Sequence, residues 1–291
     1  MYQTDPPRPA KEFLPTMYDL PSEDPEEPGL PDEFHLLQPR LLSETFRPST
    51  YPSDRVFTAS DLNLYYDVRH SLWYKRPDWF AVVGIPRLHE EKEMRLNYVV
   101  WQEGASPLVV VELLSPGTEK EDLGQTLRSV EQPPTKWQVY EQVLRVPYYF
   151  LFDRYTDTLR VFRLEADRYQ ALPLHEPRVW MPSLEIGLGL WQGTYQGIER
   201  RWLRAYDAEG NWLLNFEEQT QQAQEATQQA QQEAQQAQEA TQQAQEATQQ
   251  AQQEAQQAQR EAQQAQQEAQ QARARAERLA DRLRALGLEP D

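Results

Sequence analysis

LVVVELL at residues 108–114 decides the fold, because six of its seven residues are apolar. Such a run is typical of a central strand whose two faces are both covered. YYFLF at residues 148–152 has the same character. Between these stretches, Thr135 and Gln138 form a capping-box pair that starts a helix, and Pro147 ends it. A strand, a helix and a strand in this order predict a crossover connection, and therefore two parallel strands.

Several further stretches are rich in β-branched, aromatic and other apolar residues between turn-forming residues, as strands are. They are 64–68, 79–83, 96–101 and a hairpin pair at 159–164 and 168–172. Apolar residues at helical spacing also predict a first helix within 31–46, interrupted at Pro39. The sequence therefore predicts one α/β domain with a mixed sheet over residues 31–216.

The two flanks have a different composition. Residues 1–30 are acidic and rich in proline, which predicts a flexible arm. Residues 217–291 are rich in Ala and Gln, and no Gly or Pro interrupts 217–286, so a single long helix is expected. Its alanines recur at a mean spacing of 3.5 residues, which is the coiled-coil period. Alanine buries little area, so a solvated spacer and a homo-oligomer through this helix both remain open.

The charge and composition exclude several classes of function. The net charge is −17, and most of it lies in the two flanks, while residues 47–216 carry a net of only −3. An acidic chain is a poor nonspecific binder of nucleic acid, which counts against a DNA-acting protein. There is no cysteine, and the four histidines lack zinc-ligand spacing. Neither a signal pattern nor a membrane span is evident, so a cytoplasmic location without membrane contact is expected.

Three polar residues occupy positions where burial is costly. Asp78 follows Pro77 at the start of a strand, Glu112 lies inside LVVVELL, and Lys136 opens the helix behind that strand. Asp78 alone suggests a turn residue, and Lys136 alone suggests a solvated cation. A carboxylate such as Glu112 costs several kcal/mol in an apolar strand unless it is paired or binds a metal. Two carboxylates on adjacent strands can hold Mg²⁺ or alternatively Mn²⁺, and a nearby Lys can stabilise developing negative charge.

Taken together, these residues resemble a known family. Arg76-Pro77-Asp78, then VELLSPGT at 111–118, DLG at 122–124, Lys136 with Tyr140, and VPYY at 146–149 look like the Uma-type restriction endonucleases. This family is a branch of the PD-(D/E)XK nuclease superfamily. The resemblance covers about residues 60–175, and more weakly extends to about 215. It implies a restriction-endonuclease-like sheet flanked by helices, DNA as the substrate, Asp78 and Glu112 as metal ligands, and Lys136 as the third catalytic residue.

The chain departs from the superfamily at the lysine. The usual position, two residues after the Glu, is Leu114 here. The Uma-type pattern places the Lys on the following helix, which matches Lys136, but the stretch from Asp122 to Lys136 is longer than is typical. Lys120 is therefore a rival for the same role. Asp122 itself is interpreted as a helix-start residue, with a metal-facing acid as the alternative.

Three functions remain in competition. The first is a Mg²⁺-dependent endonuclease acting on DNA. The second is a catalytically inactive nuclease-like fold that serves as a binding or oligomerisation module through its helical tail, as the acidic surface would favour. The third is a glycan or nucleotide hydrolase that uses Asp78 and Glu112 as an acid/base pair. The position of the two carboxylates relative to one another discriminates among them.

Overall fold

The computed structural model describes residues 14–16, 19, 32–114, 119–126, 128 and 132–286. It divides into two compact units, 1–219 and 220–291. The arm predicted at residues 1–30 lies outside the described residues except for 14–16 and 19. One of these, Pro15, accepts a hydrogen bond through its carbonyl from the Trp101 indole at 2.9 Å.

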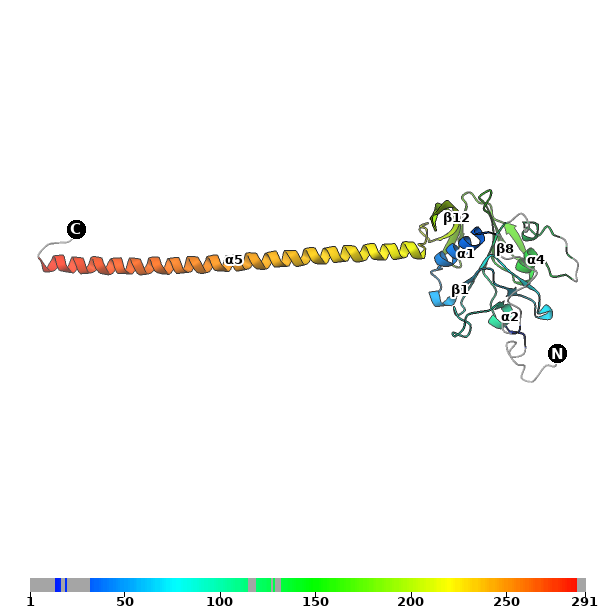
Figure 1. Ribbon diagram of the computed structural model, residues 1–291, viewed down its shortest axis with the longest axis horizontal. Helices are drawn as coiled ribbons and strands as arrows, with labels where there is room; N and C mark the ends of the chain where they lie inside the picture. The colour runs from blue at the N-terminus through cyan, green and yellow to red at the C-terminus, as the bar shows by residue number, and fades with distance from the viewer. Residues whose placement is uncertain are drawn as a thin grey trace. The chain divides into compact units, whose positions relative to one another are not determined.

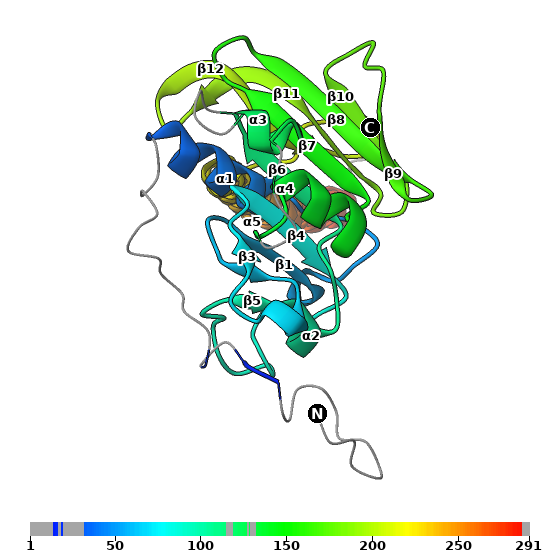
Figure 2. The same cartoon turned by 90° about the vertical axis from the view of Figure 1, so that its right-hand side faces the viewer.

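A six-stranded mixed sheet forms the centre of the first unit (Figure 2). Its strands, in spatial order, are β1 (Val56–Ala59), β4 (Trp79–Val83), β6 (Val109–Leu113), β7 (Tyr148–Asp153), β8 (Thr158–Glu165) and β9 (Arg168–Ala171). The β6–β7 pair is parallel, with Val109 opposite Tyr148, and every other pair in this sheet is antiparallel. The two mainly apolar stretches are thus the central strands, and the predicted crossover between them is confirmed.

Two smaller sheets are also present among the described residues. One has the order β3 (Tyr74–Lys75), β2 (Leu64–Tyr65), β5 (Tyr98–Val99). The other is antiparallel and contains β10 (Arg178–Met181), β11 (Ile186–Tyr195) and β12 (Ile198–Tyr206). Of the six-residue strand predicted at 96–101, only Tyr98–Val99 forms, because the residues before it bend and Val100–Glu103 turns into the short helix α2. Two 3₁₀ turns, η2 (Ser53–Arg55) and η3 (Val68–His70), lie in connections.

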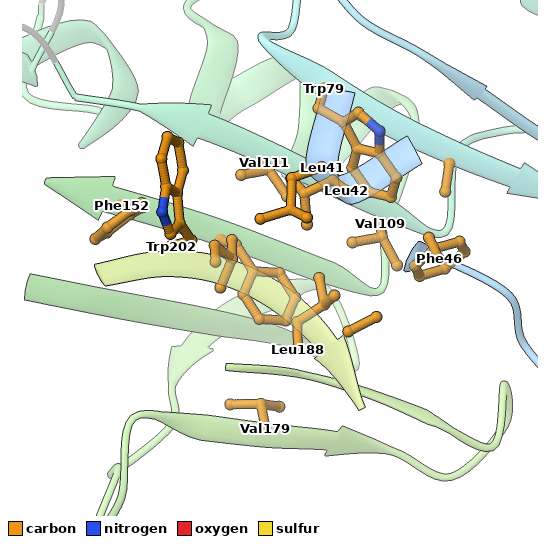
Figure 3. Packing of buried hydrophobic residues seen from close by; sticks show 14 of the residues in the cluster. Leu41, Leu42, Phe46, Trp79, Val109, Val111, Phe152, Val179, Leu188 and Trp202 are labelled. Carbon is orange, nitrogen blue, oxygen red and sulfur yellow. The ribbon is translucent and has the colours of Figure 1, made fainter. Parts of the chain in front are cut away.

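The alternation of side chains along β4 and β6 separates two apolar clusters. Odd-numbered residues such as Trp79 and Val111 pack with α1 (Phe34–Thr45) and with β11 and β12 (Figure 3). Even-numbered residues such as Phe80 and Val110 face the opposite cluster. Asp78 and Glu112 are even-numbered, so the alternation places both on this second face.

The second face is covered by the helix that the capping box predicted. Thr135 and Gln138 exchange both capping-box bonds at the start of α4 (Lys136–Gln138). The chain continues as a π-helical segment, η4 (Val139–Val143), in which the Leu144 N–H donates to the Val139 carbonyl at 2.8 Å. Tyr140 and Val139 of this segment are fully buried. Lys136 of α4 and Tyr140 of η4 are thereby held against the face that carries Glu112.

The described part of the second unit is helical. α5 (Phe216–Ala285) runs for 70 residues, and none of its residues is buried (Figure 1). The long C-terminal helix and the mixed α/β class are therefore confirmed, whereas a coiled coil stays a prediction. Within the described ranges, no helix combines the length and the apolar character that crossing a membrane requires.

Candidate active site

Asp78 and Glu112 lie side by side on neighbouring strands. Trp79 is opposite Val111 in the β4–β6 ladder, and the next pair outward is Asp78 with Glu112. The Asp78 N–H donates to Oε2 of Glu112 at 3.3 Å. Residues directly opposite in an antiparallel ladder project to the same face with their Cβ atoms about 5 Å apart. The two acids named from the sequence are thus brought together.

The peptide groups of Leu113 fix the end of β6. Its N–H donates to Oδ2 of Asp78 at 2.6 Å, and its carbonyl lies 3.2 Å from Nε2 of His35. The ladder between β4 and β6 ends at Val111, two residues before Leu113, so these two side chains take the place of the missing backbone partners. His35 is in turn held by Asp32, whose Oδ1 lies 2.9 Å from Nδ1. The first helix therefore contributes to the position of the acidic pair.

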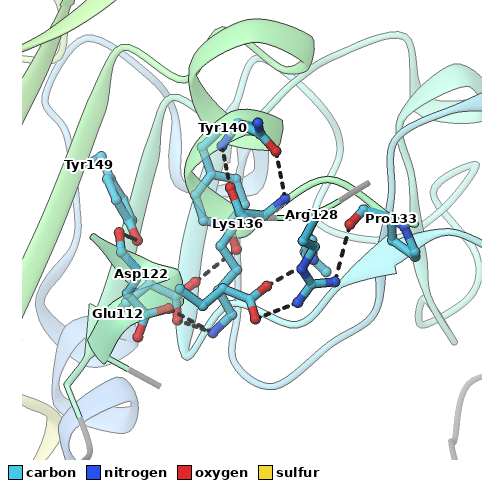
Figure 4. A network of polar contacts seen from close by, with 11 residues as sticks. Glu112, Asp122, Arg128, Pro133, Lys136, Tyr140 and Tyr149 are labelled. Carbon is cyan, nitrogen blue, oxygen red and sulfur yellow. Dashed lines mark hydrogen bonds and ion pairs between the residues drawn. The ribbon is translucent and has the colours of Figure 1, made fainter. Parts of the chain in front are cut away.

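Lys136 reaches the acidic pair from α4. Its Nζ lies 2.9 Å from Oε2 of Glu112 and 3.4 Å from Oδ1 of Asp122, and Figure 4 shows it between these two carboxylates. Tyr140, one turn further along, donates its hydroxyl proton to Oε1 of Glu112 at 2.8 Å. Lys120 is exposed on α3 (Glu119–Asp122), so it is Lys136 that the fold brings to Glu112.

Asp122 was underestimated from the sequence. Asp122 is the last residue of α3 and not a helix-start residue, and only 1% of its surface is exposed. Its carboxylate pairs with Lys136. Its backbone carbonyl accepts the hydroxyl proton of Tyr149 at 3.0 Å. The charged run EKED at 119–122 has the composition of a solvated segment. The one sequence signal that points to Asp122 is its place in the family-like motif DLG.

Burial sets the protonation of these groups. It raises the pKa of Glu112 to about 7, against the attraction of Lys136 and with the help of the Asp78 charge. Burial likewise raises the pKa of Asp78, and Lys136 opposes the rise. Desolvation disfavours the ammonium form of Lys136, but the charges of Glu112, Asp122 and Asp78 outweigh it and hold its pKa well above the usual range. Lys136 therefore stays protonated. Its single positive charge does not balance the three carboxylates of Asp78, Glu112 and Asp122.

The donor set fits a hard divalent cation. The Glu112 carboxylate is buried, that of Asp78 beside it is partly buried, and one lysine must serve both Glu112 and Asp122. Across the described ranges, no group of three or more His, Asp or Glu side chains is arranged to hold a metal. Mg²⁺ is commonly bound through one or two carboxylates, with water and substrate oxygens completing its shell. Asp78 and Glu112 supply that number.

Comparison with known proteins agrees with the geometry. A family model, Uma2, described as "Putative restriction endonuclease", matches residues 13–199. That match includes all of Asp78, Glu112, Asp122, Lys136 and Tyr140. No curated protein matches the chain. Because the match spans more than half of the sequence and contains the whole acidic site, the chain belongs to the Uma2 family.

Proposed function

We propose that the protein is a Mg²⁺-dependent endonuclease that hydrolyses DNA phosphodiester bonds. The observation that carries the proposal is the cross-strand pair of Asp78 and Glu112 with Lys136 at 2.9 Å from Glu112. Membership of a nuclease family supports the substrate class. We also propose that the protein acts in the cytoplasm.

Each residue of the site has a separate role in this proposal. Asp78 and Glu112 would hold the ion, which when bound polarises a phosphoryl oxygen and lowers the pKa of a coordinated water. The Leu113 N–H holds Asp78 Oδ2, and the Tyr140 hydroxyl holds Glu112 Oε1, so both carboxylates keep a fixed orientation. Positioned groups of this kind are what metal ligands need to act with defined geometry.

Lys136 acts as a fixed positive charge. Because its pKa is held well above the usual range, the side chain stays protonated at neutral pH and cannot take up a proton from another group. A cation beside the reacting phosphate stabilises the negative charge that builds up on the phosphoryl oxygens in the transition state. Lys136 is therefore proposed as an electrostatic residue and not as a general base.

An inactive, nuclease-derived module is the second candidate. It is favoured by the fact that both Glu112 oxygens already have protein partners, namely Lys136, Tyr140 and the Asp78 N–H. In that case the exposed α5 would be the working part, as a self-association helix. Oligomerisation through α5 is also compatible with the nuclease, and we include it in the proposal.

Incubating full-length protein with supercoiled plasmid and Mg²⁺ or Mn²⁺ tests the nuclease. We expect nicked and linear products that EDTA abolishes, and that Asp78→Asn and Glu112→Gln each abolish. Cleavage that survives both substitutions would show that this is not the active site. Stable DNA binding without cleavage under either metal would favour the inactive module.

A further inference from the structure

A second charged cluster lies next to the acidic site and takes no part in the chemistry proposed above. Its centre is Glu121, on α3. Lys75 Nζ, from β3, lies 3.1 Å from Oε1 of Glu121, and Arg128 Nη2 lies 2.6 Å from Oε2. The two oxygens of one carboxylate are thus held by two different cations, as the oxygens of a bound oxyanion would be.

The burial of the three side chains is unequal. The Lys75 side chain is 8% exposed, whereas those of Glu121 and Arg128 are 26% and 27% exposed. Burial lowers the pKa of Lys75, and Glu121 opposes this effect. A buried cation without a partner is strongly destabilising, so Lys75 requires an anion at this place. Glu121 is near enough to solvent to leave, provided that another anion replaces it.

A buried hydroxyl beside the cluster is not used. Tyr66 is 7% exposed, and its hydroxyl has no hydrogen-bond partner in the part of the chain that the structure describes. Leu64 is opposite Lys75 in the β2–β3 ladder, and Tyr66, which follows the end of β2, packs in the same apolar cluster as Leu64. The charges of Arg128 and Glu121 both act on the Tyr66 hydroxyl. Burial raises the pKa of Tyr66, so the hydroxyl remains a donor.

The cluster adjoins the acidic site at two points. Lys75 comes three residues before Asp78, and Glu121 comes directly before Asp122, which pairs with Lys136. An ammonium, a guanidinium and an unpartnered hydroxyl are all donors, and a phosphodiester offers oxygens that only accept. Each phosphodiester carries one negative charge, the same as Glu121, so replacing one by the other leaves the local charge unchanged.

We propose that Lys75, Arg128 and Tyr66 form a binding site for a DNA backbone phosphate next to the one that is cleaved, and that Glu121 occupies this site when no DNA is bound. The inference rests on the proposed function, since it requires DNA as the substrate. It makes Glu121 a competitor of the substrate, so removing its charge strengthens DNA binding.

The test measures the affinity of full-length protein for a short labelled duplex by fluorescence anisotropy at several salt concentrations. EDTA is present throughout, so that no cleavage occurs. Glu121→Gln is compared with Glu119→Gln, which removes the same charge from an exposed position on the same helix. We expect the first variant to bind several-fold more tightly than the second. Lys75→Met should weaken binding and make the salt dependence less steep by about one unit, and Lys120→Met, at an exposed position, is its control.

The outcomes separate the two proposals. Equal affinities for Glu121→Gln and Glu119→Gln would overturn the phosphate site while leaving the nuclease intact. Failure of every form to bind DNA would overturn the phosphate site, and the plasmid assay with Mg²⁺ would then decide the nuclease separately. If Lys75→Met does not fold, as a thermal melt would show, the comparison at positions 121 and 119 decides alone, because Gln keeps the shape and polarity of Glu.

Discussion

The backbone N–H of Asp78 donates to Oε2 of Glu112 at 3.3 Å, while Oδ2 of Asp78 accepts from the N–H of the next residue, Leu113, at 2.6 Å. Each acid is thus tied to the strand that carries the other. Because each carboxylate accepts a hydrogen bond from the backbone of the neighbouring strand, the sheet fixes how the two carboxylates are placed relative to one another. A substitution that spares the backbone should leave the remaining ligand in place.

Glu112→Gln should reduce Mg²⁺ affinity by more than about 100-fold, because the amide keeps the shape but lacks the charge that a hard cation requires. The fold should survive, since an amide oxygen can still accept from Tyr140. Calorimetric titration gives the affinity, and circular dichroism gives the fold. Equal Mg²⁺ binding by both forms would make Glu112 a structural residue.

Lys136→Ala should lower DNA cleavage by about 10²–10³-fold, the usual effect of removing one charge-stabilising donor. Lys120→Ala should retain most of the activity, because Lys120 is exposed on α3. Single-turnover rates with saturating enzyme measure both variants under the same conditions. The reverse order of the two losses would assign the catalytic charge to Lys120.

Magnesium binding should depend on pH, because burial raises the pKa of Glu112 to about 7. Below that pH the ion must displace a proton from the ligand, so the apparent affinity should fall by about tenfold per pH unit below 7 and level off above it. Titrations in buffers with different heats of ionisation report the proton that is released. A flat affinity profile without proton release would be incompatible with Glu112 as the titrating ligand.

Glu218→Ala should destabilise the first unit, whereas Glu217→Ala should not. Only 2% of the Arg204 side chain is exposed, and its guanidinium is paired with Glu218. Losing that partner leaves a buried cation, at a cost of about 2 kcal/mol after allowing for the partly exposed carboxylate. Urea denaturation of the two variants gives the difference. Identical midpoints would show that the ion pair contributes nothing to folding.

Truncation after Gln219 should leave the thermal transition of residues 1–219 unchanged, because that cut falls between the two compact units. Any oligomer that forms through α5 should disappear at the same time. Calorimetry measures the transition, and light scattering measures the mass. If the transition is lost, α5 is required for the fold of the first unit.

The central part of the fold could be predicted because its residues carry strong local signals. The apolar residues of LVVVELL do not follow the spacing of an amphipathic helix, so the stretch is predicted as a buried strand. The capping box of Thr135 and Gln138 marks the start of a helix without help from distant residues. The β11–β12 hairpin was not anticipated, because Gly187 and Gly193 break the strand pattern. At each, a Cβ would come within 2.1 Å or less of an aromatic ring, that of Tyr206 or Trp191 respectively. The space that these rings occupy, one on the partner strand and one on the same strand, therefore requires the residue that strand propensity disfavours.

The same contrast applies to the site. Glu112 could be named because its burial follows from its own neighbours in sequence. Asp122 and Lys75 are also buried, but by elements distant in the chain, and their local sequences read as polar connections. A single sequence therefore reveals a charged residue whose apolar neighbours in the same strand predict its burial. It does not reveal a charged residue that is buried by elements distant in the chain.

The repeat in α5 has a consequence for how two such helices could align. Alanine occupies every seventh position at 223, 230, 237, 244, 251, 258, 265 and 272. Sliding one copy by seven residues along another therefore returns nearly the same seam, and several staggered alignments have almost equal energy. Leu279, Leu283 and Leu286 occur once, beside five of the six tail arginines. In any pair of these helices, the last turns would distinguish one alignment from the next, whereas the alanine repeat would not fix the register.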